Sequence, residues 1–147
     1  MPIKPDVVIL SKGAIIERCI RRIHEEYQAD PSFASFTHMD ALILNIERAC
    51  QAAIDSAMHV IARKKLGIPK NSGDAFSLLH RAGLLPDKIT KRLKAMTGFR
   101  NIAVHQYQEI DKEILHHIAK EGWKDLVAFC THLGLKIDPD ASGGRTQ

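Results

Sequence analysis

Apolar residues recur every three or four positions along most of the chain, and this spacing limits the possible folds more than any other feature. A helix gathers such residues on one face, because it completes a turn about every 3.6 residues. No stretch alternates apolar and polar residues strongly enough to build a sheet. The sequence therefore predicts an all-α fold, an antiparallel helical bundle. The longest apolar stripe is formed by Leu42, Ile43, Ile46, Ala49, Cys50, Ala53, Ile54, Ala57 and Ile61.

Turn and cap residues divide the chain into five expected helices. Asp30 precedes a proline and so avoids helical backbone angles, which ends the first helix. Thr37 and Asp40 have the spacing of a weak capping box, which predicts the start of the second. Thr97-Gly98 is expected to bend or interrupt the fourth. The expected spans are 8–30, 37–65, 75–81, 86–96 and 111–134.

The 147 residues are enough for one domain with a hydrophobic core. We expect residues 1–135 to form that domain and residues 136–147 to be a disordered polar tail. The scattered cysteines Cys19, Cys50 and Cys130 predict reduced thiols in a cytoplasmic protein. No signal peptide or membrane-spanning segment is expected, because no apolar run approaches about 18 residues.

The net charge of the chain does not decide whether it binds RNA. The net charge is +4, from 21 Lys and Arg against 17 Asp and Glu, which is compatible with an RNA substrate and equally typical of an ordinary surface. Aromatic residues make up only 5%, which argues against a protein that stacks bases on aromatic side chains. No Cys or His spacing is typical of a metal site, so neither a metal nor a cofactor is expected. Four basic residues either guide an RNA backbone or only form soluble surface: Lys88, Lys91, Arg92 and Lys94.

The segment Arg100 to Tyr107 carries residues suited to RNA cleavage without a metal. Arg100 is a permanent cation whose planar fork fits a phosphate, and His105 exchanges a proton near neutral pH. The imidazole can take the proton of a ribose 2′-OH while the guanidinium stabilises charge on the phosphate. An Arg and a His this close are also common on any charged helix, so spacing alone leaves both interpretations open.

Helical geometry constrains how these groups meet. Arg100 and His105 are five residues apart, or about 140° around a straight helix, whereas Asn101 and His105 share a face. His105 and Tyr107 would diverge on a helix. Either the helix ends near His105, or the groups converge from two chains. We expect a two-fold axis near the motif that places two copies in one groove.

The residues from Arg100 to Tyr107 read Arg-x4-His-x-Tyr and resemble the motif of HepT-type toxins of the HEPN superfamily. Gly98-Phe99, the upstream segment Leu66–Pro69, and Asp55 with His59 also look like this family, and the resemblance covers roughly residues 4–134. It implies an all-α, HEPN-like homodimer with the motif in a cleft at the dimer interface. It also implies that Arg100 and His105 are the catalytic residues of a metal-independent endoribonuclease acting on messenger or transfer RNA.

The resemblance further implies a toxin–antitoxin system. The antitoxin would be an MntA-like nucleotidyltransferase that transfers AMP from ATP to Tyr107, adding charge and bulk that repel an RNA phosphate. Asn101 is expected to support the site by orienting His105 or the phosphate. The alternative is a non-catalytic partner of a nucleotidyltransferase that binds nucleotide or RNA, in which Arg100 and His105 hold a phosphate without cleaving it.

A polar stripe follows the expected second helix and has two interpretations. It is either a solvated face or a wall of the dimer cleft. In the second case Arg48 touches RNA and Asp55 pairs with His59, with supporting roles favoured over direct chemistry. The stripe consists of Asn45, Arg48, Gln51, Asp55 and His59.

Overall fold

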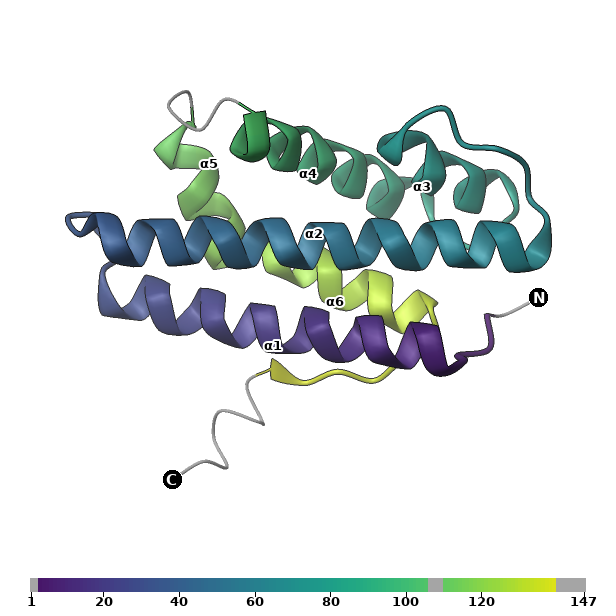
Figure 1. The fold of residues 1–147 in the computed structure, drawn as a ribbon, viewed down its shortest axis with the longest axis horizontal. Coiled ribbons are helices and arrows are strands. Elements are labelled where there is room, and N and C mark those ends of the chain that lie inside the picture. Colours follow the sequence, from purple (N-terminus) through teal and green to yellow (C-terminus); the bar gives the residue numbers. More distant parts are fainter. Residues whose placement is uncertain (1–2, 106–109, 140–147) are drawn as a thin grey trace.

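The computed structural model describes residues 3–105 and 110–139, and within these ranges it contains helices and no strand. Two long helices, α1 and α2, run antiparallel and form the spine of the molecule (Figure 1). Helices α3 and α4 lie along one side of α2, while α5, η2 and α6 complete the bundle. The expected all-α fold is confirmed. The bounds are α1 Val7–Ala29, α2 Phe36–Lys64, α3 Ser72–Arg81, α4 Asp87–His105, α5 Lys112–His117, η2 Ile118–Gly122 and α6 Trp123–His132.

The core is mainly aliphatic, as the apolar spacing predicts. On α1 the buried side chains Ile9, Ile16, Ile20 and Ile23 recur at helical intervals, and they pack towards α2. Each such side chain contributes roughly 1.5–3 kcal/mol when it is fully buried. On α2 the buried face contains several alanines, whose small side chains let neighbouring helices approach closely. They are Ala49, Ala52, Ala53 and Ala57.

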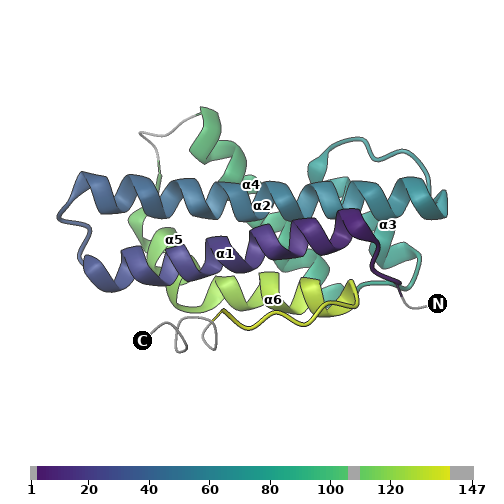
Figure 2. The same cartoon turned by 60° about the horizontal axis from the view of Figure 1, so that its bottom comes forward.

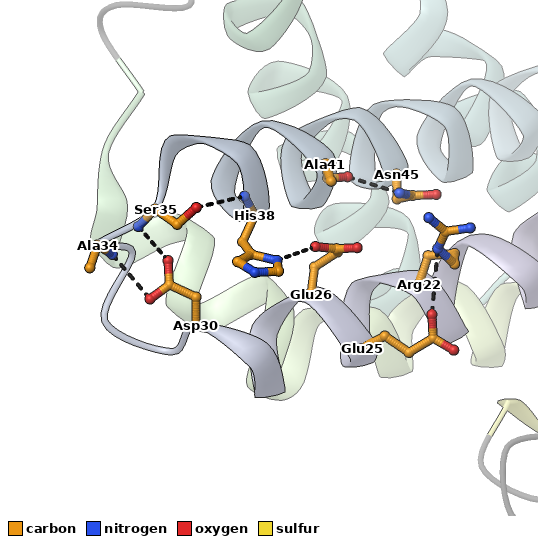
Figure 3. A network of polar contacts seen from close by, with 9 residues as sticks. All are labelled: Arg22, Glu25, Glu26, Asp30, Ala34, Ser35, His38, Ala41 and Asn45. Atoms are coloured by element: carbon orange, nitrogen blue, oxygen red, sulfur yellow. Dashed lines mark hydrogen bonds and ion pairs between the residues drawn. The ribbon is translucent and has the colours of Figure 1, made fainter.

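A network of polar contacts fixes the turn between α1 and α2 (Figure 3). The carboxylate of Asp30 accepts backbone hydrogen bonds from Ala34 at 3.1 Å and Ser35 at 2.6 Å. These bonds lower the pKa of Asp30, and the bond from Ser35 has the largest effect. Ser35 then accepts from the backbone of His38 and caps α2. The expected capping box at Thr37 is therefore wrong, because Asp30 positions Ser35 at the helix start instead.

Helix α4 continues through Gly98 to His105, so the expected interruption at Thr97-Gly98 is also wrong. The buried side chains of Leu93, Met96 and Phe99 hold this helix against the core on both sides of the glycine. The Thr97 hydroxyl donates to the Leu93 carbonyl at 3.0 Å, so it is satisfied within the helix.

The last expected helix is divided. Asp111 caps its start, as predicted, but a π-helical segment, η2, separates α5 from α6. The side chain of His116 stacks on Phe33 at 4.4 Å and shares a 2.7 Å hydrogen bond with the hydroxyl of Tyr27. These contacts attach α5 to the turn between α1 and α2.

After α6 the chain reverses direction and runs back beside α6 (Figure 2) and along α1 (Figure 1). Leu135 packs over Gly13, where a Cβ atom would overlap the leucine side chain. The Asp138 backbone donates to the Glu17 carboxylate at 2.8 Å, and Ile137 packs against the core. Ile137 and Asp138, expected in the tail, therefore pack against the folded domain, and residues 140–147 lie outside the described chain. No helix in the described ranges has the length and hydropathy needed to cross a bilayer.

Candidate active site

Arg100 lies on the side of α4 that faces α2, and two hydrogen bonds hold its guanidinium. Nη2 donates to Gln51 Oε1 on α2, and Nη1 donates to Asn101 Oδ1 at 3.2 Å. The side chain is half-buried, and its Nε has no acceptor within the described ranges. A planar cation held in this way presents its remaining N–H groups in a defined direction, which suits a phosphate oxygen.

Gln51 connects Arg100 to a second pair of charged side chains. Its Nε2 donates to Asp55 Oδ1 at 2.9 Å, and Lys12 of α1 forms a 3.1 Å ion pair with Asp55 Oδ2. Side chains of three helices, α4, α2 and α1, are thus linked in one network. Because each partner restricts the rotamers of the next, the network fixes the guanidinium before a ligand binds.

Asn101 and His105 follow Arg100 on the last turns of α4. Asn101 is exposed, and its carboxamide oxygen accepts from Arg100. The sequence did not suggest this contact, because the expected partners of Asn101 were His105 or the substrate. His105 is the final residue of α4, which agrees with the expectation that the helix ends near it. The side chain of His105 and the whole of Tyr107 lie outside what the structure describes.

The polar stripe of α2 has a mixed environment in the single chain, and its role as a wall of a dimer cleft stays a prediction. Asn45 is buried and donates to the Ala41 carbonyl at 2.8 Å, whereas Arg48 is exposed. Gln51 reaches Arg100 across the interface with α4. Sequence periodicity placed these residues on one side of α2, but only the packing of α4 shows which of them meets the motif.

The expected pair of Asp55 and His59 is wrong. His59 Nε2 contacts Asp6 Oδ2 at 2.6 Å, and Arg63 donates to the same oxygen at 2.7 Å. Asp6 also caps α1 by accepting from the Ile9 backbone. Antiparallel packing brings the start of α1 over the end of α2, so His59 meets this carboxylate, while Asp55 is occupied by Lys12.

The cysteines are unsuited to nucleophilic chemistry. All three are buried and free. Burial raises the pKa of Cys50 and of Cys130 to about 12, and raises that of Cys19 as well. A thiol must lose its proton to act as a nucleophile. Among the described side chains, no group of three or more His, Cys, Asp or Glu is placed to hold a metal ion.

A pocket of about 360 Å³ lies between α4 and the helices α5, η2 and α6, and Gln51 is not among its lining residues. Met96 and Phe99 of α4 form part of its wall, and His117 and Ile118 line it from α5 and η2. Arg92 at its edge pairs with Asp125 at 3.3 Å. The pocket does not include Arg100 or Asn101, so the hydrogen-bonded arginine, and not the cavity, marks the candidate site.

The helical fold and the arginine at the end of α4 define a HEPN-type ribonuclease domain. Residues 16–133 match the family model described as ribonuclease HepT-like. This protein belongs to the ribonuclease HepT-like family. The family inferred from the motif at residues 100–107 is therefore confirmed.

Named relatives and a solved structure agree with the assignment to this family. The chain is 42% identical over 123 residues to the mRNA nuclease HepT of Shewanella oneidensis, covering 83% of this chain and 92% of that protein. It is 27% identical over 107 residues to the tRNA nuclease HepT of Aphanizomenon flos-aquae, covering 71% and 73%. A solved structure of the tri-AMPylated Shewanella oneidensis HEPN toxin with an MNT antitoxin superposes with a TM-score of 0.84 and 39% identity, over 88% of this chain and 98% of that one.

Proposed function

We propose that this protein is the toxin of a toxin–antitoxin pair and a metal-independent endoribonuclease that cleaves messenger or transfer RNA. The observation that carries the proposal is the guanidinium of Arg100, held by Gln51 and Asn101 close to the end of α4, where His105 lies. The names of the two relatives, an mRNA nuclease and a tRNA nuclease, support RNA as the substrate. The reaction belongs in the cytoplasm, where thiols such as the three free cysteines stay reduced.

In the proposed reaction His105 removes the proton of a ribose 2′-OH, and the 2′-oxygen attacks the neighbouring phosphorus. The bond from phosphorus to the 5′-oxygen breaks, leaving a 2′,3′-cyclic phosphate, and the departing oxygen takes up a proton to become a 5′-OH. Arg100 stabilises the negative charge that builds on the phosphate. Asn101 helps to hold Arg100 in place through its carboxamide oxygen.

The site is proposed to be completed by a second copy of the chain. Because α4 is continuous from Arg100 to His105, the two residues leave it about 140° apart, and a two-fold axis beside the motif lets two copies combine in one groove. Apolar side chains on this side of the molecule support an interface between copies. Leu44 of α2 is 42% exposed and Val104 of α4 is 41% exposed.

The proposed antitoxin is an MntA-like nucleotidyltransferase that attaches AMP to Tyr107. The support is the related toxin, which is described as tri-AMPylated and in complex with an MNT antitoxin. An AMP group two residues from His105 adds negative charge, which repels an RNA phosphate from the site. The test is co-expression with such an antitoxin, followed by intact-mass measurement. AMP mass is expected on the parent chain and is reduced or absent in Tyr107→Phe, whereas an unchanged pattern in that variant would place the modification elsewhere.

Expression of this chain alone tests the nuclease proposal. Growth should stop, and the purified protein should cleave a messenger RNA transcript in buffer containing EDTA. His105→Ala and Arg100→Ala should each remove cleavage while the circular dichroism spectrum stays unchanged. His117→Ala, which alters an exposed histidine on α5, is the matched control and should remain active.

Two outcomes would decide against the nuclease proposal as stated. A chain that binds RNA but neither cleaves it nor stops growth is a non-catalytic partner that only holds a phosphate. Cleavage that disappears in EDTA requires a metal and removes the proposed mechanism.

A further inference from the structure

Gly98 lies in the interior of α4 at an exposed position, where this chain has no need of a glycine. A Cβ atom built on it meets no atom of the described residues within 4 Å, and Gly98 is not one of the glycines with a positive φ angle. A glycine inside a helix destabilises the protein relative to alanine. Packing within the chain therefore does not explain why the side chain is missing.

At two other positions the fold itself requires a glycine. At Gly13 a Cβ atom would overlap Leu135, and at Gly134 the φ angle is +84° and a Cβ atom would lie 2.9 Å from the Ile3 carbonyl oxygen. Both positions are constrained by the fold itself. Gly98 differs because no described residue occupies the space above it, so that space is free for a ligand to approach the helix backbone.

The face of α4 that carries Gly98 also carries Lys94 at one end and the motif residues Asn101 and His105 at the other. Lys94, Gly98, Asn101 and His105 follow one another at intervals of four, three and four residues, which places these positions on one side of a helix. Lys94, Gly98 and Asn101 are exposed. The face is polar and basic, and it lies to the side of the buried residues Met96 and Phe99.

Lys94 differs from the two basic residues that precede it most closely on α4, Lys91 and Arg92, in its electrostatic environment. Lys91 pairs with Asp87 at 3.0 Å and Arg92 with Asp125 at 3.3 Å. The ammonium of Lys94 donates to the neutral hydroxyl of Ser77 at 2.9 Å, and it has no carboxylate within ion-pair distance in the described ranges. Its positive charge thus remains available to an anion.

We propose that an RNA strand lies along this face, with Lys94 contacting a phosphate outside the cleaved linkage and Gly98 allowing the RNA backbone to approach α4 closely. The proposal rests on the nuclease function above. Lys94 is eleven residues from His105, or about 16 Å along a helix, so it contacts a different phosphate from the one that reacts. The charge and polarity of the face favour RNA over a second protein chain, whose interfaces have few lysines at their centre.

The test uses full-length protein and an RNA oligonucleotide that the parent cleaves. Gly98→Ala should raise the melting temperature by about 2–4 °C, and yet raise KM by about threefold or more. Lys94→Ala should reduce the slope of log kcat/KM against log salt concentration by about 0.7–1. Lys120→Ala removes an exposed lysine of η2 and serves as the matched control, with an unchanged slope.

The outcomes separate this inference from the nuclease proposal. If the parent cleaves RNA, but Gly98→Ala keeps the parental KM and Lys94→Ala keeps the parental salt slope, the RNA path is wrong and the nuclease stands. If Gly98→Ala changes the mass of the particle in analytical ultracentrifugation, the face belongs to a contact between copies, and the assignment to RNA is overturned. A parent that cleaves no RNA removes the proposed function itself.

Discussion

The guanidinium of Arg100 donates a hydrogen bond to the side-chain oxygen of Gln51, which joins the motif on α4 to the middle of α2. Gln51 is held in turn by Asp55, and Asp55 by Lys12. The residue proposed to stabilise the transition state is therefore positioned by a glutamine 49 positions away in the sequence.

We expect Gln51→Leu to lower kcat by about ten- to a hundredfold, because a lost hydrogen bond to a charged group corresponds to about 1.5–3 kcal/mol. KM should change much less, since the arginine charge remains. Steady-state cleavage of an RNA oligonucleotide measures both constants. Gln28→Leu makes the same chemical change at an exposed position of α1 and should behave like the parent. An unchanged kcat in Gln51→Leu would show that Arg100 is positioned without it.

Asp6 makes the stability depend on pH. Hydrogen bonding to His59 first, then to the Ile9 backbone, holds the pKa of Asp6 well below its usual value. A carboxyl whose folded pKa is depressed stabilises the fold above its unfolded pKa, about 3.9. This contribution is lost as the pH falls further, towards the folded pKa.

Asp6→Asn should therefore melt at a lower temperature than the parent at pH 6, and the difference should shrink below about pH 4. Thermal unfolding followed by circular dichroism across this range measures it. A difference of constant size from pH 6 to pH 2.5 would contradict the linkage.

Gly13 provides the space that Leu135 occupies. We expect Gly13→Ala to destabilise the protein by about 1–3 kcal/mol, because the new methyl group overlaps the leucine. Combining it with Leu135→Ala should cost less than the sum of the two single changes. Urea unfolding of the four proteins gives the coupling, and additive effects would show that the two positions are independent.

The cysteines should be inert in the folded protein. With the pKa of Cys50 and Cys130 raised to about 12 by burial, little thiolate exists at pH 8. Iodoacetamide is therefore expected to leave RNA cleavage unchanged, with complete labelling only after unfolding in urea. Rapid inactivation of the native protein would imply an accessible thiol close to the reaction.

Local patterns in the sequence were sufficient for the all-helical fold and for the motif, but not for the bounds of every helix or for the contacts between helices. The spacing of Ile16, Ile20 and Ile23 predicts a buried helical face without knowledge of its neighbours. The pairing of Asp55 with His59 failed because such a prediction considers one helix at a time. Asp6 and Lys12 reach these residues only after α1 has packed against α2.

The continuity of α4 was missed for a related reason. Thr97-Gly98 has low helix propensity, and propensity is a local quantity. Burial of Leu93, Phe99 and Ala103 on either side of the glycine outweighs it. The contact of Arg100 with Gln51 depends on the same packing, so no reading of residues 98–107 by themselves could have found it.

The packing of Leu135 on Gly13, which joins the end of the chain to the start of α1, has a practical consequence for anyone who shortens this protein. The stretch that matches the family model, 16–133, omits Leu135 at one end and Ile9 with its capping residue Asp6 at the other. A fragment cut to those limits lacks the first turns of α1 and the segment after α6. The core side chains that these parts cover would be exposed to solvent, and the fragment would tend to aggregate. Soluble expression requires the chain to extend past both limits, with any affinity tag placed beyond residue 139.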